Sequence, residues 1–161
     1  MKKLLLCLLA VMMLAGCTSK PKVKVAKDQK FVVEDLTIYL PSYFESMTYK
    51  HYNACYQADE EGILLLREEA SLFNDFKNLT IEGYLGKVIS NNDLNSKVEK
   101  KDGVWQIYWE YTSSSDLVLC YFATGLKGKD CFWLVQYTFD KDDYAKYAKL
   151  FPAYIANISV K

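Results

Sequence analysis

The spacing of hydrophobic and polar residues in the first half of the chain predicts β-structure. Residues 31–41 are apolar and rich in β-branched side chains, are interrupted by two acidic residues and end at Pro41. This pattern predicts two short strands or one bent strand. Residues 49–58 and 63–69 flank an acidic turn that ends in Gly62, so we expect a β-hairpin there.

A helix is expected over residues 80–89. Apolar residues recur there at helical spacing and form one stripe, and Thr80 is placed to act as the N-cap. Gly83 and Gly86 lower the intrinsic helix propensity, so this helix must depend on packing against a sheet. The stripe consists of Ile81, Tyr84, Leu85, Val88 and Ile89.

Four successive strands are expected between residues 97 and 139. Asp102-Gly103 is a type I′ turn signal, and each connection is too short for a crossover helix, so the strands must pair antiparallel. Residues 117–123 and 131–135 are apolar on both faces and should be central strands with cover on both sides of the sheet. The strand before them has one apolar face, made of Trp105, Ile107, Trp109 and Tyr111.

The C-terminal segment predicts a helix that is interrupted once. Asp140 is a suitable N-cap, Asp142 and Asp143 suit the positive end of the helix dipole, and Pro152 should break the helix before a second turn. The predicted fold class is therefore α+β, with an antiparallel sheet of about six to seven strands covered by helices on both faces. Residues 31–161 form one domain in this interpretation.

The N-terminus has the pattern of a secretion signal. Two lysines are followed by an uncharged apolar run and by small residues, which predicts a signal peptide over residues 1–16. Leu14-Ala15-Gly16-Cys17 resembles the lipobox of bacterial lipoproteins. That resemblance implies a lipid attached to the Cys17 sulfur and cleavage before it, and two acyl chains anchor a protein stably. The alternative is an ordinary signal peptide with a chance cysteine.

Residues 17–30 are rich in lysine and predict a tether between the lipid and the domain. Its lysines either contact anionic head groups or are simply solvated. The expected location is the extracytoplasmic face of a bacterial membrane.

Composition excludes several classes of protein. The 161 residues are 51% hydrophobic and 25% charged, which excludes a disordered or coiled-coil chain. Lys and Arg number 20, as do Asp and Glu, so no basic face is available for nucleic acid. Removal of residues 1–16 takes away two lysines and leaves 18 basic against 20 acidic groups, a net charge of −2.

Cysteine use points to a domain held together by its core. Of the five cysteines, Cys7 leaves with the signal peptide and Cys17 takes the lipid. Cys55, Cys120 and Cys131 remain, and three cysteines cannot all pair. A bridge between Cys120 and Cys131 across a hairpin and two buried free thiols are both open alternatives.

The sequence carries no recognisable catalytic set. His51 is the one histidine, and it is expected to be a half-exposed sheet residue. Four residues along a strand separate it from Cys55 by about 13 Å, too far for a nucleophile and its base. The acidic clusters at 59–61 and 140–143 do not match a calcium loop. We therefore predict no catalytic residue, no metal site and no cofactor.

The unusual feature of composition is the content of 13 tyrosines and three tryptophans. Such side chains suit contact surfaces, although they also fill a core and its rim. Six of them are candidates for a groove that binds a peptide, a glycan or an envelope protein: Tyr43, Tyr49, Tyr52, Tyr56, Tyr108 and Tyr111.

The order of elements resembles the PsbP-like fold family, which includes photosystem extrinsic proteins, bacterial DcrB-like lipoproteins and a eukaryotic Ran-binding protein. The resemblance is carried by residues 36–41, 64–68, 80–89, 131–135 and 151–160. It implies an α/β/α sandwich and a role in binding or assembly. The expected function is that of a membrane-anchored, non-enzymatic binding or assembly module. The alternatives are an envelope hydrolase with a cysteine nucleophile and a small solute-capturing lipoprotein.

Overall fold

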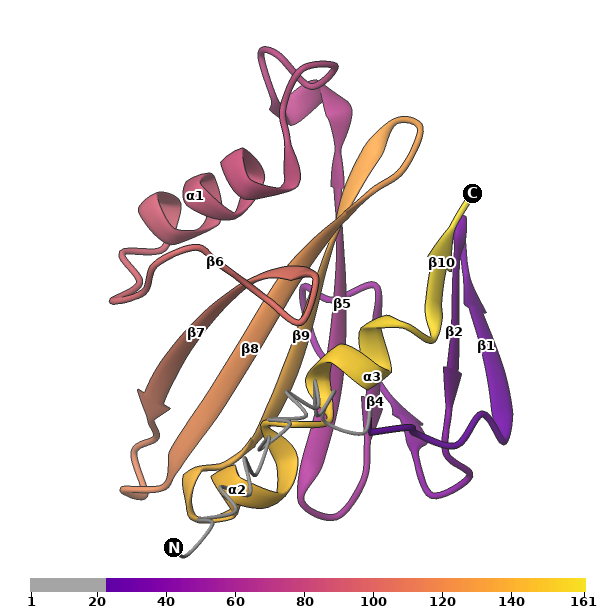
Figure 1. Cartoon of the computed structure of the whole chain (residues 1–161), viewed down its shortest axis with the longest axis vertical. Coiled ribbons are helices and arrows are strands. Elements are labelled where there is room, and N and C mark those ends of the chain that lie inside the picture. Colours follow the sequence, from indigo (N-terminus) through magenta and orange to yellow (C-terminus); the bar gives the residue numbers. More distant parts are fainter. Residues whose placement is uncertain (1–22) are drawn as a thin grey trace, which may run out of the picture.

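Two antiparallel sheets form the frame of the protein (Figure 1). The computed structural model describes residues 23–161. The large sheet has the strand order β3-β4-β5-β9-β8-β7-β6, and the small sheet has the order β1-β2-β10. The strands are β1 (Gln29–Val33), β2 (Leu36–Leu40), β3 (Glu45–Met47), β4 (Ala54–Gln57), β5 (Glu61–Glu69), β6 (Glu99–Lys101), β7 (Val104–Thr112), β8 (Val118–Lys127), β9 (Cys131–Asp140) and β10 (Ile158–Val160).

Three α-helices and two 3-10 turns complete the fold. The helices are α1 (Ile81–Asn91), α2 (Tyr144–Tyr147) and α3 (Phe151–Ile155), and the turns are η1 (Ala70–Leu72) and η2 (Lys141–Asp143). Thr80 caps α1 as predicted, since its Oγ1 accepts a hydrogen bond of 3.1 Å from the Gly83 N–H. Asp140 caps η2, and Pro152 begins a separate helix, so the interrupted C-terminal helix is also confirmed.

The antiparallel meander and the hairpin of β4 and β5 are confirmed, but Gly62, predicted to end the turn of that hairpin, lies within β5 and pairs with Gln57. β6 to β9 pair in sequence, and β9 also pairs with β5, which places β9 at the centre of the large sheet. Asp102 and Gly103 both have positive φ, as a type I′ turn requires. The first strand begins at Gln29, two residues before the predicted start of the domain.

The prediction of helices on both faces of the sheet is wrong in one respect. α1 covers one face, whereas the other face is covered mainly by the small sheet, with α2 and α3 beside it (Figure 1). The reason is the turn at Glu34, whose φ is 52°, because it folds residues 29–40 into a hairpin that β10 then joins. The inward-facing residues of β2 in this hairpin, Leu36, Ile38 and Leu40, are fully buried, and the hairpin takes the place of a helix.

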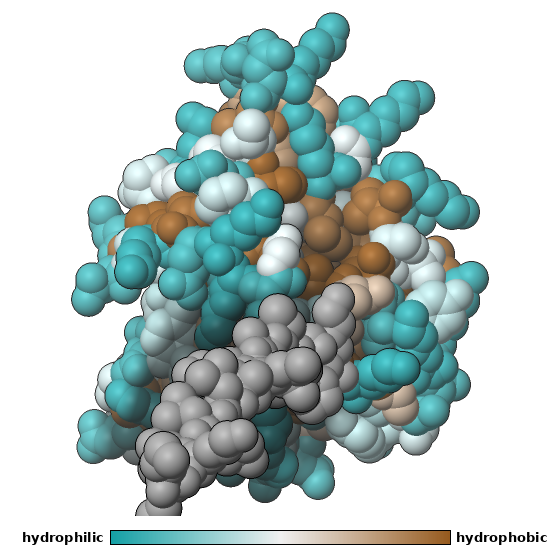
Figure 2. All heavy atoms as spheres, viewed as in Figure 1, coloured by the Kyte–Doolittle hydropathy of each residue, from teal (hydrophilic) through white to brown (hydrophobic). Residues whose placement is uncertain are grey.

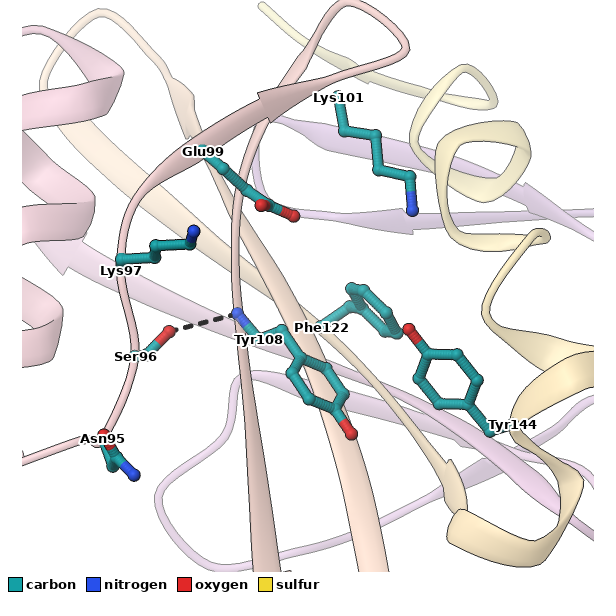
Figure 3. Close-up of a pocket in the computed structure, with 8 residues that line it drawn as sticks. All are labelled: Asn95, Ser96, Lys97, Glu99, Lys101, Tyr108, Phe122 and Tyr144. Carbon is teal, nitrogen blue, oxygen red and sulfur yellow. Dashed lines mark hydrogen bonds between the residues drawn. The ribbon is translucent and has the colours of Figure 1, made fainter.

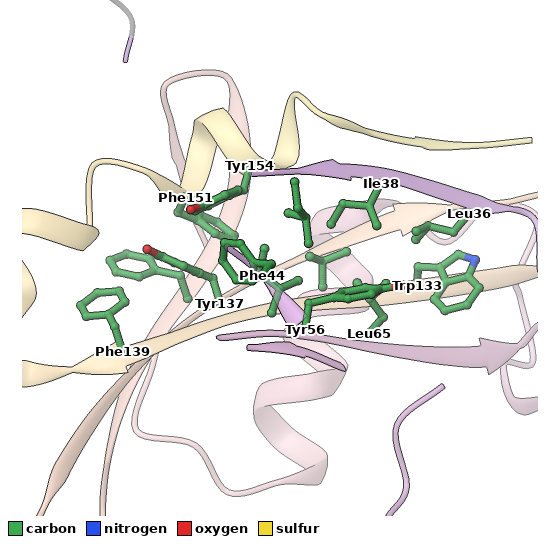
Figure 4. Packing of buried hydrophobic residues seen from close by; sticks show 14 of the residues in the cluster. Leu36, Ile38, Phe44, Tyr56, Leu65, Trp133, Tyr137, Phe139, Phe151 and Tyr154 are labelled. Carbon is green, nitrogen blue, oxygen red and sulfur yellow. The ribbon is translucent and has the colours of Figure 1, made fainter. Parts of the chain in front are cut away.

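Each face of the large sheet has its own core. The first core lies between the large sheet and the small sheet, and contains Trp133, Tyr137, Phe151 and many residues of β2 (Figure 4). The second core lies under α1. Because alternate residues of β9 face opposite sides, this strand supplies both cores, with Phe132 and Leu134 facing α1. The prediction that β9 is covered on both sides is confirmed.

The surface carries few large hydrophobic side chains. Figure 2 shows that hydrophilic residues cover most of the face in view and that hydrophobic residues reach the surface mainly in its upper half. Within residues 23–161, no helix has both the length and the apolar character needed to cross a membrane. The prediction of a signal peptide and a lipobox falls on residues 1–17, outside the described residues.

A buried carboxylate sits at the start of β5 in the first core. Glu61 is 6% exposed and accepts hydrogen bonds from three tyrosine hydroxyl groups. The Tyr43 hydroxyl lies 3.2 Å from Oε1, the Tyr154 hydroxyl lies 3.1 Å from both oxygens, and the Tyr137 hydroxyl donates to Oε2. The three phenols satisfy the buried carboxylate in place of water.

Alkaline pH is expected to unfold the protein. Burial raises the pKa of Tyr56 to about 12 and raises the pKa of Tyr84, Tyr137 and Tyr154 well above the ordinary value of 10.0. Because the folded protein holds these protons more tightly than the unfolded chain, their contribution to stability is complete below pH 10 and is lost as the pH rises further.

Ultraviolet absorbance of tyrosinate, recorded beside circular dichroism, measures this effect. The exposed tyrosines should ionise first and leave the fold intact. The buried ones should ionise together with unfolding. A native-like spectrum with every tyrosine ionised would contradict the prediction.

Candidate functional site

The six tyrosines proposed from the sequence do not form one groove. Tyr56 is 3% exposed and belongs to the first core, so it is not a surface residue (Figure 4). Tyr108 lies on the side of the small sheet, whereas Tyr52 faces α1 across the large sheet. The other three tyrosines, Tyr43, Tyr49 and Tyr111, are exposed.

A pocket lies under the second half of α1, and we call it the α1 pocket. Its volume is about 460 Å³. The floor comes from β5 and β9, the roof comes from α1 and the residues after it, and the walls are the turn before β4 and the middle of β7. Tyr52 is the only one of the six candidate tyrosines that lines it. Ligand sites are commonly hollows of this size.

α1 is held in place over the floor by Tyr84. The Tyr84 ring stacks on the Phe132 ring with a centroid distance of 4.3 Å and an interplanar angle of 4°. Its hydroxyl donates to Glu68 Oε2. Gly125 allows this close approach, because a Cβ there would lie 2.6 Å from the Tyr84 ring. The roof of the pocket is therefore fixed by aromatic packing and one hydrogen bond.

Two polar side chains in the pocket have unused hydrogen-bonding capacity. Gln136 is 7% exposed, and its Oε1 accepts a hydrogen bond of 3.4 Å from the Tyr52 hydroxyl. Its Nε2 donates to no described residue, and Glu68 Oε1 accepts from none. Burial raises the pKa of Tyr52 and of Tyr84, so both hydroxyl groups remain protonated donors at neutral pH.

The mouth of the pocket is basic. Lys50, His51 and Lys87 line it and are exposed, and neither lysine forms an ion pair within the described part of the chain. His51 has a φ of 76° and lies in the turn between β3 and β4. The expectation that His51 is a sheet residue is therefore wrong. The preceding strand ends at Met47, and the left-handed backbone at His51 is incompatible with a strand.

A second hollow of about 400 Å³ lies on the opposite side of the large sheet (Figure 3). Lys97, Glu99 and Lys101 extend over Tyr108 and the other aromatic residues of its floor. Three of its polar side chains, those of Ser96, Glu99 and Tyr108, have hydrogen-bonding partners among the described residues. Glu99 accepts from Gln106 at 3.0 Å, and the Tyr108 hydroxyl donates to Glu110 at 2.7 Å. Burial, reinforced by contact with Cys120, raises the pKa of Tyr108. The α1 pocket is the better candidate because a donor and an acceptor on its floor, Gln136 Nε2 and Glu68 Oε1, have no partner among the described residues.

The three cysteines of the described chain are free and buried. The bridge between Cys120 and Cys131 is ruled out by register, because Cys120 pairs with Phe139, eight residues from Cys131 along β9. This offset corresponds to about 26 Å. Burial raises the pKa of all three thiols, so the reactive thiolate is disfavoured. His51 lies in an exposed turn, whereas Cys55 is 1% exposed.

An acidic cluster joins the two sheets through Arg67. Arg67 Nη2 lies 2.9 Å from Asp130, and Arg67 Nε lies 3.0 Å from Glu34. The neighbouring Asp35 accepts a hydrogen bond of 2.8 Å from Trp133 Nε1. Asp35, Asp130 and Cys131 lie close enough together to hold a metal ion. The guanidinium group of Arg67 already pairs with both carboxylates, so the cluster is explained as a structural connection.

Sequence reasoning missed the polar residues of the α1 pocket. Gln136, Glu68 and Lys87 come from β9, β5 and α1, and only the pairing of β5 with β9 and the packing of α1 bring them together. One signal was present in the sequence. Gln136 interrupts an apolar run over residues 131–137, and a buried amide within such a run needs a hydrogen-bonding partner.

No family model and no curated protein match the chain. Similar solved structures include cyanobacterial PsbP (CyanoP) from Synechocystis sp. PCC 6803, which is 12% identical with a TM-score of 0.56, over 92% of this chain and 99% of that one. A protein from Bacteroides thetaiotaomicron VPI-5482 is 11% identical with a TM-score of 0.57, over 84% of this chain and 49% of that one.

The Ran-binding protein Mog1p of Saccharomyces cerevisiae is 10% identical with a TM-score of 0.51, over 82% of this chain and 94% of that one. This chain thus spans about half of the Bacteroides protein and nearly all of the other two. At such identities the likeness concerns the fold and not the activity. This chain therefore has a PsbP-like fold: an antiparallel sheet, a crossover through α1, and a small sheet packed against the large one.

Proposed function

We propose that the chain is a membrane-anchored extracytoplasmic lipoprotein that acts as a non-enzymatic binding module through the α1 pocket. The anchor is supported by the sequence Leu14-Ala15-Gly16-Cys17 after an apolar run that begins with two lysines. Residues 17–28 precede β1 and supply the tether. The domain then faces the extracytoplasmic space, held to the membrane by the lipid on Cys17.

The observation that supports the binding role most strongly is that the side-chain nitrogen of Gln136 has no hydrogen-bonding partner among the described residues. Gln136 is 7% exposed, but its Nε2 is not one of the fully enclosed side-chain atoms without a partner, so this donor is open to the pocket and to the solvent in it. Gln136 Nε2 borders the pocket and has no partner in the described part of the chain. A ligand with a hydrogen-bond acceptor would supply that partner.

Labelling with a radioactive fatty acid tests the anchor. The wild-type chain should incorporate palmitate and fractionate with membranes. The Cys17→Ala variant should incorporate none and should keep its signal peptide. The signal peptidase II inhibitor globomycin should cause the lipidated precursor to accumulate. Normal processing and release of the protein under globomycin would contradict the proposal. Cys7→Ala, in the same N-terminal segment, is the matched control and should leave lipidation unchanged.

A cysteine hydrolase is disfavoured by burial, and thiol labelling measures this directly. In the native protein Cys55, Cys120 and Cys131 should react with a thiol reagent at least about a hundredfold more slowly than after unfolding in urea, because exposure and thiolate formation both require opening of the core. One cysteine labelled rapidly at neutral pH in the native protein would instead support the enzyme alternative.

A further inference from the structure

We infer that the α1 pocket binds a saccharide that carries an acidic group. This inference rests on the proposed binding role of the same pocket and names the class of ligand. Three features of the pocket support it: hydrogen-bonding groups of both kinds at its floor, aromatic surfaces at its walls, and unpaired cations at its mouth.

The two ends of the floor offer complementary hydrogen-bonding groups. Glu68 Oε1 is a free acceptor, and Gln136 Nε2 is a free donor. Gln136 pairs in register with Leu64, so the two positions are four residues apart along neighbouring strands, or about 13 Å. A sugar hydroxyl group can donate to a carboxylate and accept from an amide. An elongated ligand with hydroxyl groups at both ends therefore satisfies this floor.

The walls suit the C–H faces of sugar rings. Tyr52 and Trp109 line the pocket and are partly exposed. The Trp109 ring is held by stacking on Tyr121, with a centroid distance of 5.0 Å and an interplanar angle of 8°. A ring fixed in this way presents a flat apolar surface at little cost in conformational entropy. Between the two ends the floor consists of Leu66 and Leu134.

The mouth adds selectivity for negative charge. Lys50 and Lys87 line the pocket without an ion-pair partner among residues 23–161. A fatty acid would also place a carboxylate there, but its alkyl chain would leave Gln136 and Glu68 without partners. Buried polar groups reject a ligand that cannot pair with them. A sugar with an acidic substituent meets the requirements of both the floor and the mouth.

Calorimetric titration of the full chain in detergent tests the ligand class with three matched probes. N-acetylmuramic acid carries a sugar ring and a lactyl carboxylate, N-acetylglucosamine is the same ring without the acid, and D-lactate is the acid without the ring. The acidic sugar should bind about three- to fivefold more tightly than the neutral sugar, as expected for exposed ion pairs. D-lactate should bind far more weakly than either. Equal binding of the two sugars, stronger binding of D-lactate, or no sugar binding would overturn the inference.

Two variants assign the binding to the α1 pocket. Gln136→Leu should lower the affinity for both sugars about tenfold, because a hydrogen bond to the ligand is lost. Lys87→Gln should reduce the preference for the acidic sugar, by weakening binding of the acidic sugar more than binding of the neutral sugar, and Lys50 should retain the rest. Lys149→Gln changes an exposed lysine that does not line the pocket and should change neither affinity. Lys87 is exposed, so its substitution keeps the test valid even if Gln136→Leu impairs folding.

The labelling experiment separates this inference from the proposed anchor. A chain that is lipidated at Cys17 but binds none of the sugars would overturn the ligand class and leave the anchor standing. A chain that binds the acidic sugar through the α1 pocket but carries no lipid would overturn the anchor and leave the ligand class standing.

Discussion

Replacing Glu61 by alanine should lower the free energy of unfolding by about 3 kcal/mol. The loss comes from the tyrosines around it. Tyr137 and Tyr154 are each 1% exposed. Without the carboxylate the Tyr137 hydroxyl group would be buried without an acceptor, and the Tyr154 hydroxyl group would keep only the Tyr43 hydroxyl group, 3.3 Å away. Each such group costs about 1–3 kcal/mol. Tyr43 is 55% exposed and would hydrogen-bond to water instead. Urea titration followed by circular dichroism measures the change.

The neighbouring residue provides the control for this prediction. Glu60 is an exposed glutamate that accepts from Lys146 at 2.6 Å and from Tyr147 at 2.5 Å. Glu60→Ala should have a smaller effect, because Glu60 and Lys146 are exposed and only one buried hydroxyl group, that of Tyr147, loses its acceptor. If Glu60→Ala and Glu61→Ala lowered the free energy of unfolding equally, the position in the hairpin, and not the three phenols around Glu61, would determine the effect.

Gly125→Ala should destabilise the protein by about 2 kcal/mol, because it disturbs the contact between α1 and the large sheet. The new Cβ would lie 2.6 Å from one ring carbon of Tyr84 and 2.9 Å from another. Tyr84 cannot move away easily, because it stacks on Phe132 and donates to Glu68. Overpacking of this kind costs about 1–3 kcal/mol. Thermal unfolding measures the loss, and ligand affinity of the α1 pocket should fall with it because the roof shifts.

A second glycine, in α1 itself, separates packing from backbone flexibility. A Cβ at Gly86 would meet no atom within 4 Å. Gly86→Ala should therefore raise stability by up to about 1 kcal/mol, because alanine is the better helix former. If both alanine variants changed stability in the same direction, close packing at Gly125 could not be the cause.

Local signals in the sequence predicted most of the individual elements. The N-cap at Thr80, the turn at Asp102-Gly103 and the break at Pro152 depend on neighbouring residues alone, and all three are confirmed. The small sheet as a covering layer could not be predicted in this way. β10 pairs with β2 across more than 110 residues of sequence, and only the shape of the first core brings the two together.

The candidate site was predicted less well than the fold. Tyrosine content drew attention to residues that turn out to lie on different faces, and Tyr56 is in the core. A tyrosine on a strand has an apolar ring and a polar tip, so its type does not reveal which face it occupies. Gln136 and Glu68 lie in the same pocket only because of the register in which β5 and β9 pair, and this register cannot be read from the amino-acid sequence alone.

The central position of β9 also determines when the chain can fold. β9 lies between β5, which precedes it by about 70 residues, and β8, which directly precedes it. Both cores need its side chains, so the second core is incomplete until Leu134 has been synthesised and the first core until Tyr154. Pairings so distant in sequence slow folding, because the intervening loop must be closed before any contact compensates for its entropy. The chain should therefore remain open during most of its synthesis, with folding of both layers coupled in one late, cooperative step.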